Sequence, residues 1–247
     1  MYGPNARWVM TERPCGDVQR SRSELTVGPS HVEWNGNALE ITIEERDTRL
    51  FNPFRRQVRG KVRVIPEALN PASFALDGCE NHIWHCMAPR ARIEEVMEEP
   101  GISWTGKGYF DHNRGREPLE DGFRVWHWSR AHMREGAVVC YEGERADGSL
   151  FASAIRFNAA GIPEEDDLPQ MAELTRSKWG IARRPRSEIG LSKVQRAWED
   201  TPFYSRAELT SQLYGEQVVA VQESLDMQRF ANPIVQFMLP YRMPREG

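Results

Sequence analysis

Two short segments of this 247-residue chain carry chemically useful side chains at two-residue spacing. The segment NHIWH contains His82 and Trp84, and the segment YFDHN contains Tyr109 and Asp111. In an extended strand alternate side chains share a face, so each pair presents both of its members to one side. The spacing therefore predicts a pocket walled by aromatic rings that also holds an imidazole and a carboxyl group.

Asp111 is the residue best suited to donate a proton. A carboxyl group among aromatic rings loses hydration, and unless it is paired it keeps its proton and can serve as an acid. Two plainer interpretations stay open. Trp84 and Tyr109 would be core aromatics and His82 a satisfied histidine lining a barrel. Asp111 would be a turn residue that binds its own backbone in the DHN segment.

Strands are expected to position these residues. Apolar and polar residues alternate over short runs bounded by turn residues, which predicts a mainly β fold. Asn35-Gly36 and Asp147-Gly148 separate such runs and predict tight hairpins. Further strands are expected over residues 7–13, 59–65, 81–87, 122–131 and 217–222. The acidic segments 91–99 and 164–176 are expected to form loops or one short helix each.

The strands fall into two groups on either side of residues 98–100, so the sequence predicts two domains, 1–100 and 101–247. The chain is long enough for one large all-β domain or two smaller ones. No apolar run approaches the roughly 20 residues of a membrane-spanning helix, and no signal peptide precedes MYGPNARW. We therefore expect a cytoplasmic location with peripheral membrane contact at most. The basic run at 183–186 is expected to be a solvated surface loop, with contact to anionic lipid as the alternative.

Several classes of function lack support. A net charge of −4 provides no basic surface for nucleic acid. The four cysteines show no CxxC spacing, and His82 and His85 would diverge on a strand, so we predict no metal. Serine hydrolase, nucleotide-triphosphatase and dinucleotide-binding motifs are missing from the sequence.

Four stretches together resemble the carotenoid 1,2-hydratase family, also called hydroxyneurosporene synthases: YGPNARWVMTERP, NHIWH, GKGYFDHNRGREPLEDGF and WHWSRA. The resemblance implies two lipocalin-like antiparallel β-barrel or sandwich domains, no cofactor, and addition of water to the terminal C1=C2 bond of an acyclic carotenoid such as neurosporene or lycopene. Members of that family carry a substantial segment upstream of the first stretch. We therefore expect the first lipocalin-like domain, within 1–100, to be truncated at its N-terminus.

The resemblance also implies functional roles for His82, Trp84, Tyr109 and Asp111. Asp111 would protonate the alkene, which leaves a tertiary cation at C1. Trp84 and Tyr109 would stabilise that cation through their ring faces, and His82 would orient water or accept its proton. Substrate and product would exchange with the inner or photosynthetic membrane. Two alternatives remain: a non-catalytic lipid or isoprenoid carrier, and a polyene cyclase or pericyclase.

Overall fold

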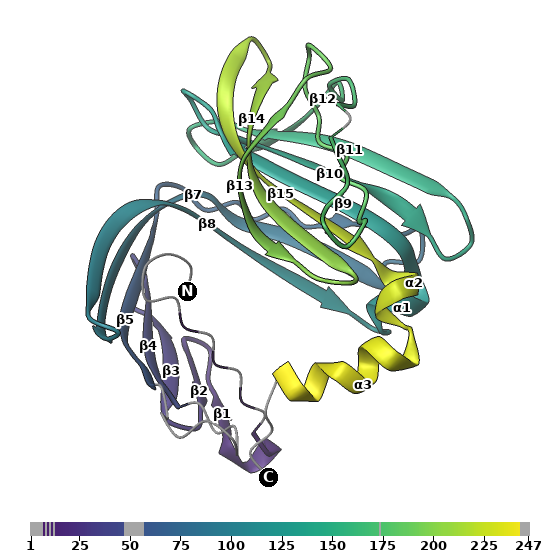
Figure 1. The fold of residues 1–247 in the computed structure, drawn as a ribbon. Coiled ribbons are helices and arrows are strands. Elements are labelled where there is room, and N and C mark those ends of the chain that lie inside the picture. The colour runs from purple at the N-terminus through teal and green to yellow at the C-terminus, as the bar shows by residue number, and fades with distance from the viewer. Residues whose placement is uncertain are drawn as a thin grey trace. The chain divides into compact units, whose positions relative to one another are not determined.

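Antiparallel β-sheet dominates the computed structural model of the chain (Figure 1). The structure describes Arg7, Val9, Thr11 and the ranges 13–46, 57–172 and 174–242. The prediction of a mainly β fold is confirmed.

The first sheet has the strand order β1-β2-β3-β4-β5-β7-β6, and β8 pairs with β7. Its strands are β1 (Val18–Arg20), β2 (Glu24–Val27), β3 (Ser30–Trp34), β4 (Leu39–Arg46), β5 (Gln57–Pro66), β6 (Phe74–Ala75), β7 (His82–Glu99) and β8 (Ile102–Gly115). A short 3₁₀ helix, Cys15–Asp17, precedes β1. The prediction of a strand over 7–13 is wrong for Arg7, Val9, Thr11 and Arg13, the residues of that segment that the structure describes.

The second sheet has the strand order β12-β11-β10-β9-β15-β14-β13. Its strands are β9 (Phe123–His132), β10 (Ala137–Arg145), β11 (Leu150–Phe157), β12 (Pro163–Asp166), β13 (Lys193–Asp200), β14 (Tyr204–Leu213) and β15 (Glu216–Asp226). The helices are α1 (Leu119–Gly122), α2 (Met227–Phe230) and α3 (Pro233–Arg242). As far as the described strands go, both sheets are open and not closed into barrels.

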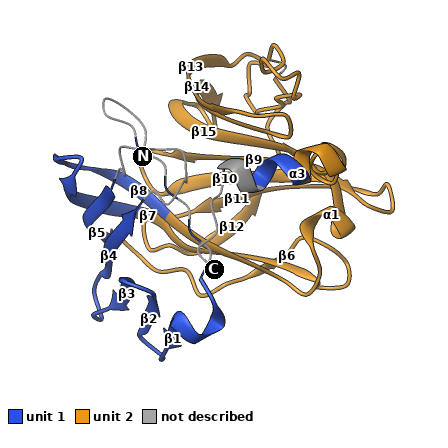
Figure 2. Ribbon diagram, turned by 60° about the horizontal axis from the view of Figure 1, so that its bottom comes forward, with its two compact units in different colours: residues 1–66, 91–109, 237–247 blue, residues 67–90, 110–236 orange. Residues whose placement is uncertain are grey.

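Contacts divide the chain into two compact units that alternate along the sequence (Figure 2). Unit 1 comprises the described residues of 1–66, 91–109 and 237–247, and unit 2 comprises those of 67–90 and 110–236. The division into domains at residue 100 stays a prediction. Every interaction of the candidate site described below lies within unit 2.

Both predicted hairpins form, because their turns supply the required backbone conformation. Asn35 Oδ1 accepts hydrogen bonds from the backbone N–H groups of Asn37 and Ala38, at 3.0 and 2.9 Å. Asp147 Oδ1 accepts one from Ser149 N–H at 2.8 Å, and Gly148 adopts a φ of +86° that suits glycine. The first turn joins β3 to β4 and the second joins β10 to β11.

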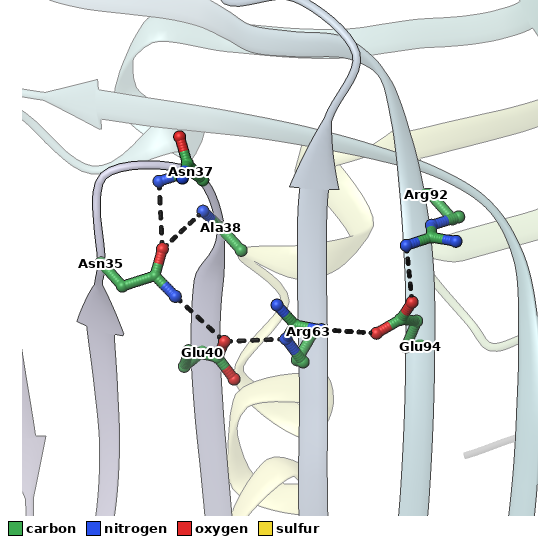
Figure 3. A network of polar contacts seen from close by, with 7 residues as sticks. All are labelled: Asn35, Asn37, Ala38, Glu40, Arg63, Arg92 and Glu94. Carbon is green, nitrogen blue, oxygen red and sulfur yellow. Dashed lines mark hydrogen bonds and ion pairs between the residues drawn. The ribbon is translucent and has the colours of Figure 1, made fainter.

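Segment 91–99 is a strand, so the prediction of a loop or short helix there is wrong. It forms the second part of β7 and pairs with β5. Arg63 on β5 donates to Glu40 at 2.7 Å and to Glu94 at 2.8 Å, and Arg92 pairs with Glu94 at 2.7 Å (Figure 3). Opposite charges on facing strand positions favour pairing, so partners on β4 and β5 compensate for the acidic composition.

One face of the second sheet carries an apolar core in unit 2. Its members are Ala131, Met133, Val138, Cys140, Ala154, Leu213, Val218 and Ala220. The segment between β12 and β13 contacts this region: Leu168 packs on the core, and Glu188 N–H bonds Gln212 O at 2.8 Å. Arg183 in this segment is buried and donates to Thr175 O at 2.9 Å. The prediction that 183–186 is a solvated surface loop is therefore wrong for Arg183. It is likewise wrong for buried Pro185 and for Arg186, whose side chain is 12% exposed and pairs with Glu142.

Candidate active site

Strand β7 alternates as its sequence predicts. His82, Trp84 and Cys86 are buried, whereas Ile83 and His85 are only partly covered. The strand begins where Asp77 Oδ2 accepts the backbone N–H of His82 at 2.9 Å. The first residues of β7 therefore present the imidazole and the indole to the interior of unit 2.

Trp84 and Asp111 contact each other directly. The indole Nε1 donates a hydrogen bond to Asp111 Oδ2 at 3.0 Å. Trp84 is 1% exposed and Asp111, on β8, is partly buried. A buried indole has two side-chain torsions that packing fixes, so this bond holds the carboxyl group in one place. The structure thus brings together two of the four predicted residues.

Aromatic rings from several strands surround Trp84. Phe74 on β6 lies 5.3 Å from it, and Tyr141 on β10 lies 5.7 Å from it, between ring centroids. Tyr141 in turn lies 6.0 Å from Trp126 on β9 and 6.0 Å from Phe151 on β11. These separations are typical of favourable aromatic pairs. The predicted aromatic wall is present, but most of it comes from residues that the sequence patterns did not single out.

The His82 ring has different partners from Trp84. Its Nε2 lies 3.2 Å from Glu117 Oε1, and its ring packs edge-on against Phe123 at 4.8 Å. Glycines close around the ring: a Cβ atom at Gly122 would lie 2.4 Å from Nε2, and one at Gly115 would lie 3.0 Å from Nδ1. His82 is thus held in a fitted pocket with Glu117 as its partner.

A cavity of about 180 Å³ lies beside this histidine. Its lining includes His82, Asn113, Glu117 and Trp126. Trp126 contacts Tyr141, so the cavity and the Trp84–Asp111 pair share one aromatic cluster. An apolar pocket with a few polar groups is the usual form of a small-molecule site.

Tyr109 lies two positions before Asp111 on β8 and is partly buried. By its contacts it belongs to unit 1, whereas Asp111 belongs to unit 2. Its predicted role stays a prediction. Tyr141 is the phenol that packs beside Trp84 in unit 2.

The second sheet adds a carboxyl group that the sequence patterns did not reveal. Glu223 on β15 forms an ion pair with Arg206, Oε1 to Nε, at 3.2 Å. Burial raises the pKa of Glu223, and the charge of Asp111 raises it further, while Arg206 opposes both effects. Burial likewise raises the pKa of Tyr141, with added contributions from Asp111 and Glu223. The charges of both carboxyl groups, Asp111 and Glu223, therefore act on the Tyr141 hydroxyl group.

A separate cavity of about 330 Å³ is lined by His127, Glu142, Arg184 and Arg186 among others. His127 Nδ1 lies 2.8 Å from Ser224 Oγ, and burial lowers its pKa to about 4, with smaller contributions from Arg184 and Arg186. None of the four predicted site residues lines this cavity.

Within the described ranges, no group of three or more His, Cys, Asp or Glu side chains is placed to hold a metal ion. The same residues include no helix with the length and apolar character needed to cross a membrane.

Two solved structures share the fold. An AttH-type protein from Nitrosomonas europaea aligns with a TM-score of 0.54 at 12% identity, over 87% of this chain and 73% of its own. CghA bound to Sch210972 aligns with a TM-score of 0.51 at 9% identity, over 85% and 69% respectively. At these identities the likeness concerns the fold alone.

Sequence relatives are much closer. The acyclic carotenoid 1,2-hydratase of Thiocapsa roseopersicina is 43% identical over 250 residues, and that of Rubrivivax gelatinosus is 39% identical over 251 residues. Each alignment covers 100% of this chain but 61% of the relative, so the chain spans about three-fifths of their length. The enzyme of the same name from Cereibacter sphaeroides is 35% identical, over 99% of this chain and 86% of its own. The model of the carotenoid hydratase CrtC family matches residues 1–247, and the chain belongs to that family.

Proposed function

We propose that this chain acts as a carotenoid 1,2-hydratase that adds water to the terminal C1=C2 bond of an acyclic carotenoid such as neurosporene or lycopene. Family membership and the names of the relatives support this activity. The observation that carries the mechanism is the hydrogen bond from buried Trp84 to Asp111 within an aromatic cluster.

In the first step Asp111, in its acid form, gives its proton to C2. The π electrons form the new C–H bond, and C1 becomes a tertiary cation. The Trp84 N–H points at the carboxyl oxygen and stabilises the carboxylate that remains after the transfer. The indole N–H would thus assist the acid step in two ways: it fixes the position of the carboxyl group, and it stabilises the negative charge that the group gains.

The cation at C1 would be stabilised by ring faces. The ring centroids of Trp84 and Tyr141 lie 5.7 Å apart, and Tyr109 lies on the same strand as Asp111. A cation over an aromatic face gains about 0.5–2 kcal/mol, and more when water is excluded. A buried cluster of rings suits this task.

Water must then attack C1 and lose a proton. His82 is a candidate to orient this water or accept its proton, because Glu117 fixes the orientation of its ring through Nε2. Since acyclic carotenoids dissolve in membranes, we also propose that the protein is cytoplasmic and exchanges substrate with the inner or photosynthetic membrane through peripheral contact.

The test compares Asp111→Asn with a matched control, Asp121→Asn, on lycopene dispersed in lipid vesicles. The amide oxygen of the introduced asparagine can still accept the Trp84 bond, so the fold should persist. We expect hydration to fall by about 10²–10⁴-fold for Asp111→Asn, as for loss of a general acid, and to change little for Asp121→Asn, which alters an exposed side chain. Circular dichroism checks the fold.

Product analysis separates the alternatives. A gain of one water in mass supports hydration, whereas an isomer of unchanged mass indicates a cyclase. Bound lycopene without turnover, together with indifference to Asp111→Asn, indicates a carrier. Full activity of Asp111→Asn would refute the role of Asp111 as the acid.

A further inference from the structure

The second sheet directs a row of polar and aromatic side chains toward the cluster around Trp84. Tyr141 pairs directly with Trp128, and Trp128 pairs with Glu223. Directly paired residues on neighbouring antiparallel strands point to the same face, so Tyr141 and Glu223 share a face. The strands involved, β10, β9 and β15, lie side by side (Figure 1). Tyr141 on this face contacts Trp84, the partner of Asp111.

Tyr141 places a hydroxyl group in the aromatic cluster that surrounds Trp84. Its side chain is 4% exposed. Burial and two nearby carboxyl groups raise the pKa of this hydroxyl group and keep it protonated. A protonated hydroxyl group beside the Trp84 ring can donate a hydrogen bond to a water molecule there.

Glu223 is positioned to receive a proton. Arg206 holds its Oε1 at 3.2 Å, and the Tyr204 side chain also hydrogen-bonds to it. Burial is the main cause that raises the pKa of Glu223, and the charge of Asp111 adds to it, whereas Arg206, the Tyr204 hydrogen bond and Arg130 lower it. The net effect is a raised pKa, which makes the carboxylate a better base than an exposed one.

On these grounds, and resting on the proposed hydratase function, we propose that Glu223 is a second catalytic carboxyl group. Its carboxylate takes a proton from the water that attacks C1, and the Tyr141 hydroxyl group positions that water. A lone pair of the water oxygen forms the C1–O bond, one O–H bond breaks, and its proton passes to Glu223. Asp111 has by then lost its proton to C2, so a proton returns from Glu223 to Asp111 through solvent before the next turnover.

Glu223 suits this step better than His82. The Nε2 of His82 already contacts Glu117, and Gly115 and Gly122 close tightly over both ring nitrogens. Of the two roles proposed above for His82, this assignment leaves it the orientation of water from the wall of the adjoining cavity, while Glu223 accepts the proton.

Hydrogen–deuterium exchange at C2 of the substrate distinguishes the role of Asp111 from that of Glu223. In D₂O, protonation by Asp111 followed by return of a proton from C2 places deuterium in the recovered alkene, without any need for Glu223. We expect Glu223→Gln to hydrate lycopene at least about 100-fold more slowly while exchange at C2 continues within a few-fold of the original rate. Asp111→Asn should lose both hydration and exchange at C2. Tyr141→Phe should lose about tenfold in hydration and keep exchange.

The matched control is Glu144→Gln, which makes the same change on the same sheet. Glu144 pairs with Arg124 at 2.8 Å and its side chain is 36% exposed, so hydration should stay unchanged. Glu223→Asp keeps a carboxylate and should recover part of the activity, which guards against a loss caused by misfolding. The acid limb of the pH–rate profile should be present in the original protein and missing from Glu223→Gln.

Hydration by Glu223→Gln at the original rate would overturn the assignment, and so would loss of exchange together with hydration in a folded Glu223→Gln protein. Retained exchange and hydration in Asp111→Asn would instead refute the proposed acid step, whatever Glu223 does.

Discussion

Replacing Trp84 with phenylalanine should destabilise the protein far more than the same change at Trp104. Trp84→Phe removes the N–H that donates to Asp111 at 3.0 Å, in a side chain that is 1% exposed. Loss of this hydrogen bond to a carboxyl group in a partly buried site costs about 1–3 kcal/mol, and the lost apolar atoms add about 1 kcal/mol. We expect the free energy of unfolding to fall by roughly 2–4 kcal/mol, which lowers Tm by roughly 5–15 °C.

Trp104 provides the control because it makes the same kind of bond at the surface. Its Nε1 donates to Glu95 Oε2 at 2.7 Å, yet the residue is 44% exposed. Water replaces that bond when it is lost, so Trp104→Phe should cost less than about 1 kcal/mol.

Thermal unfolding followed by circular dichroism measures both variants, and turnover of lycopene by Trp84→Phe measures the effect on the acid. Phenylalanine keeps a ring face for the cation but cannot hold the carboxyl group, so kcat should fall more than KM changes. Equal Tm shifts for the two variants, or an unchanged kcat in Trp84→Phe, would show that the Trp84 bond does not hold the Asp111 carboxyl group in place.

Two further changes test other contacts of unit 2. Because the pKa of His127 is lowered to about 4 in the folded protein, the unfolded chain binds the extra proton first, and stability should fall by roughly 3 kcal/mol as pH drops from about 6.5 to 4. This loss should be smaller in His127→Asn, as measured by urea unfolding across pH. Gly122→Ala places a methyl group 2.4 Å from His82 Nε2, so it should lower stability by about 1–3 kcal/mol in the same assay, and an unchanged value would contradict this packing.

Local patterns in the sequence were enough to predict the strand that carries His82 and Trp84. The period of two along a strand is fixed by backbone geometry, so NHIWH determined which side chains would be buried together. The turns at Asn35-Gly36 and Asp147-Gly148 were equally readable, because few residue pairs adopt their backbone conformations.

Features that depend on distant partners could not be predicted. Glu94 lies in a segment whose acidic composition suggests loop or helix, and pairing with β5, including the bond from Arg63, stabilises a strand there. Tyr141 stands in an apolar run typical of any core strand, and Glu223 lies far along the chain from Asp111. Their places in the candidate site follow from the pairing of β10, β9 and β15, which no local motif encodes.

The length of β7 constrains how this gene can change. One uninterrupted strand bears Trp84 near its start and Glu94 near its end, each matched to a different set of neighbours. Deletion of one residue between Trp84 and Glu94 would turn one of these two side chains to the opposite face of the sheet, because successive side chains along a strand alternate between faces. Deletion of two residues would preserve both orientations. We therefore expect folded variants of β7 to differ in length by even numbers of residues.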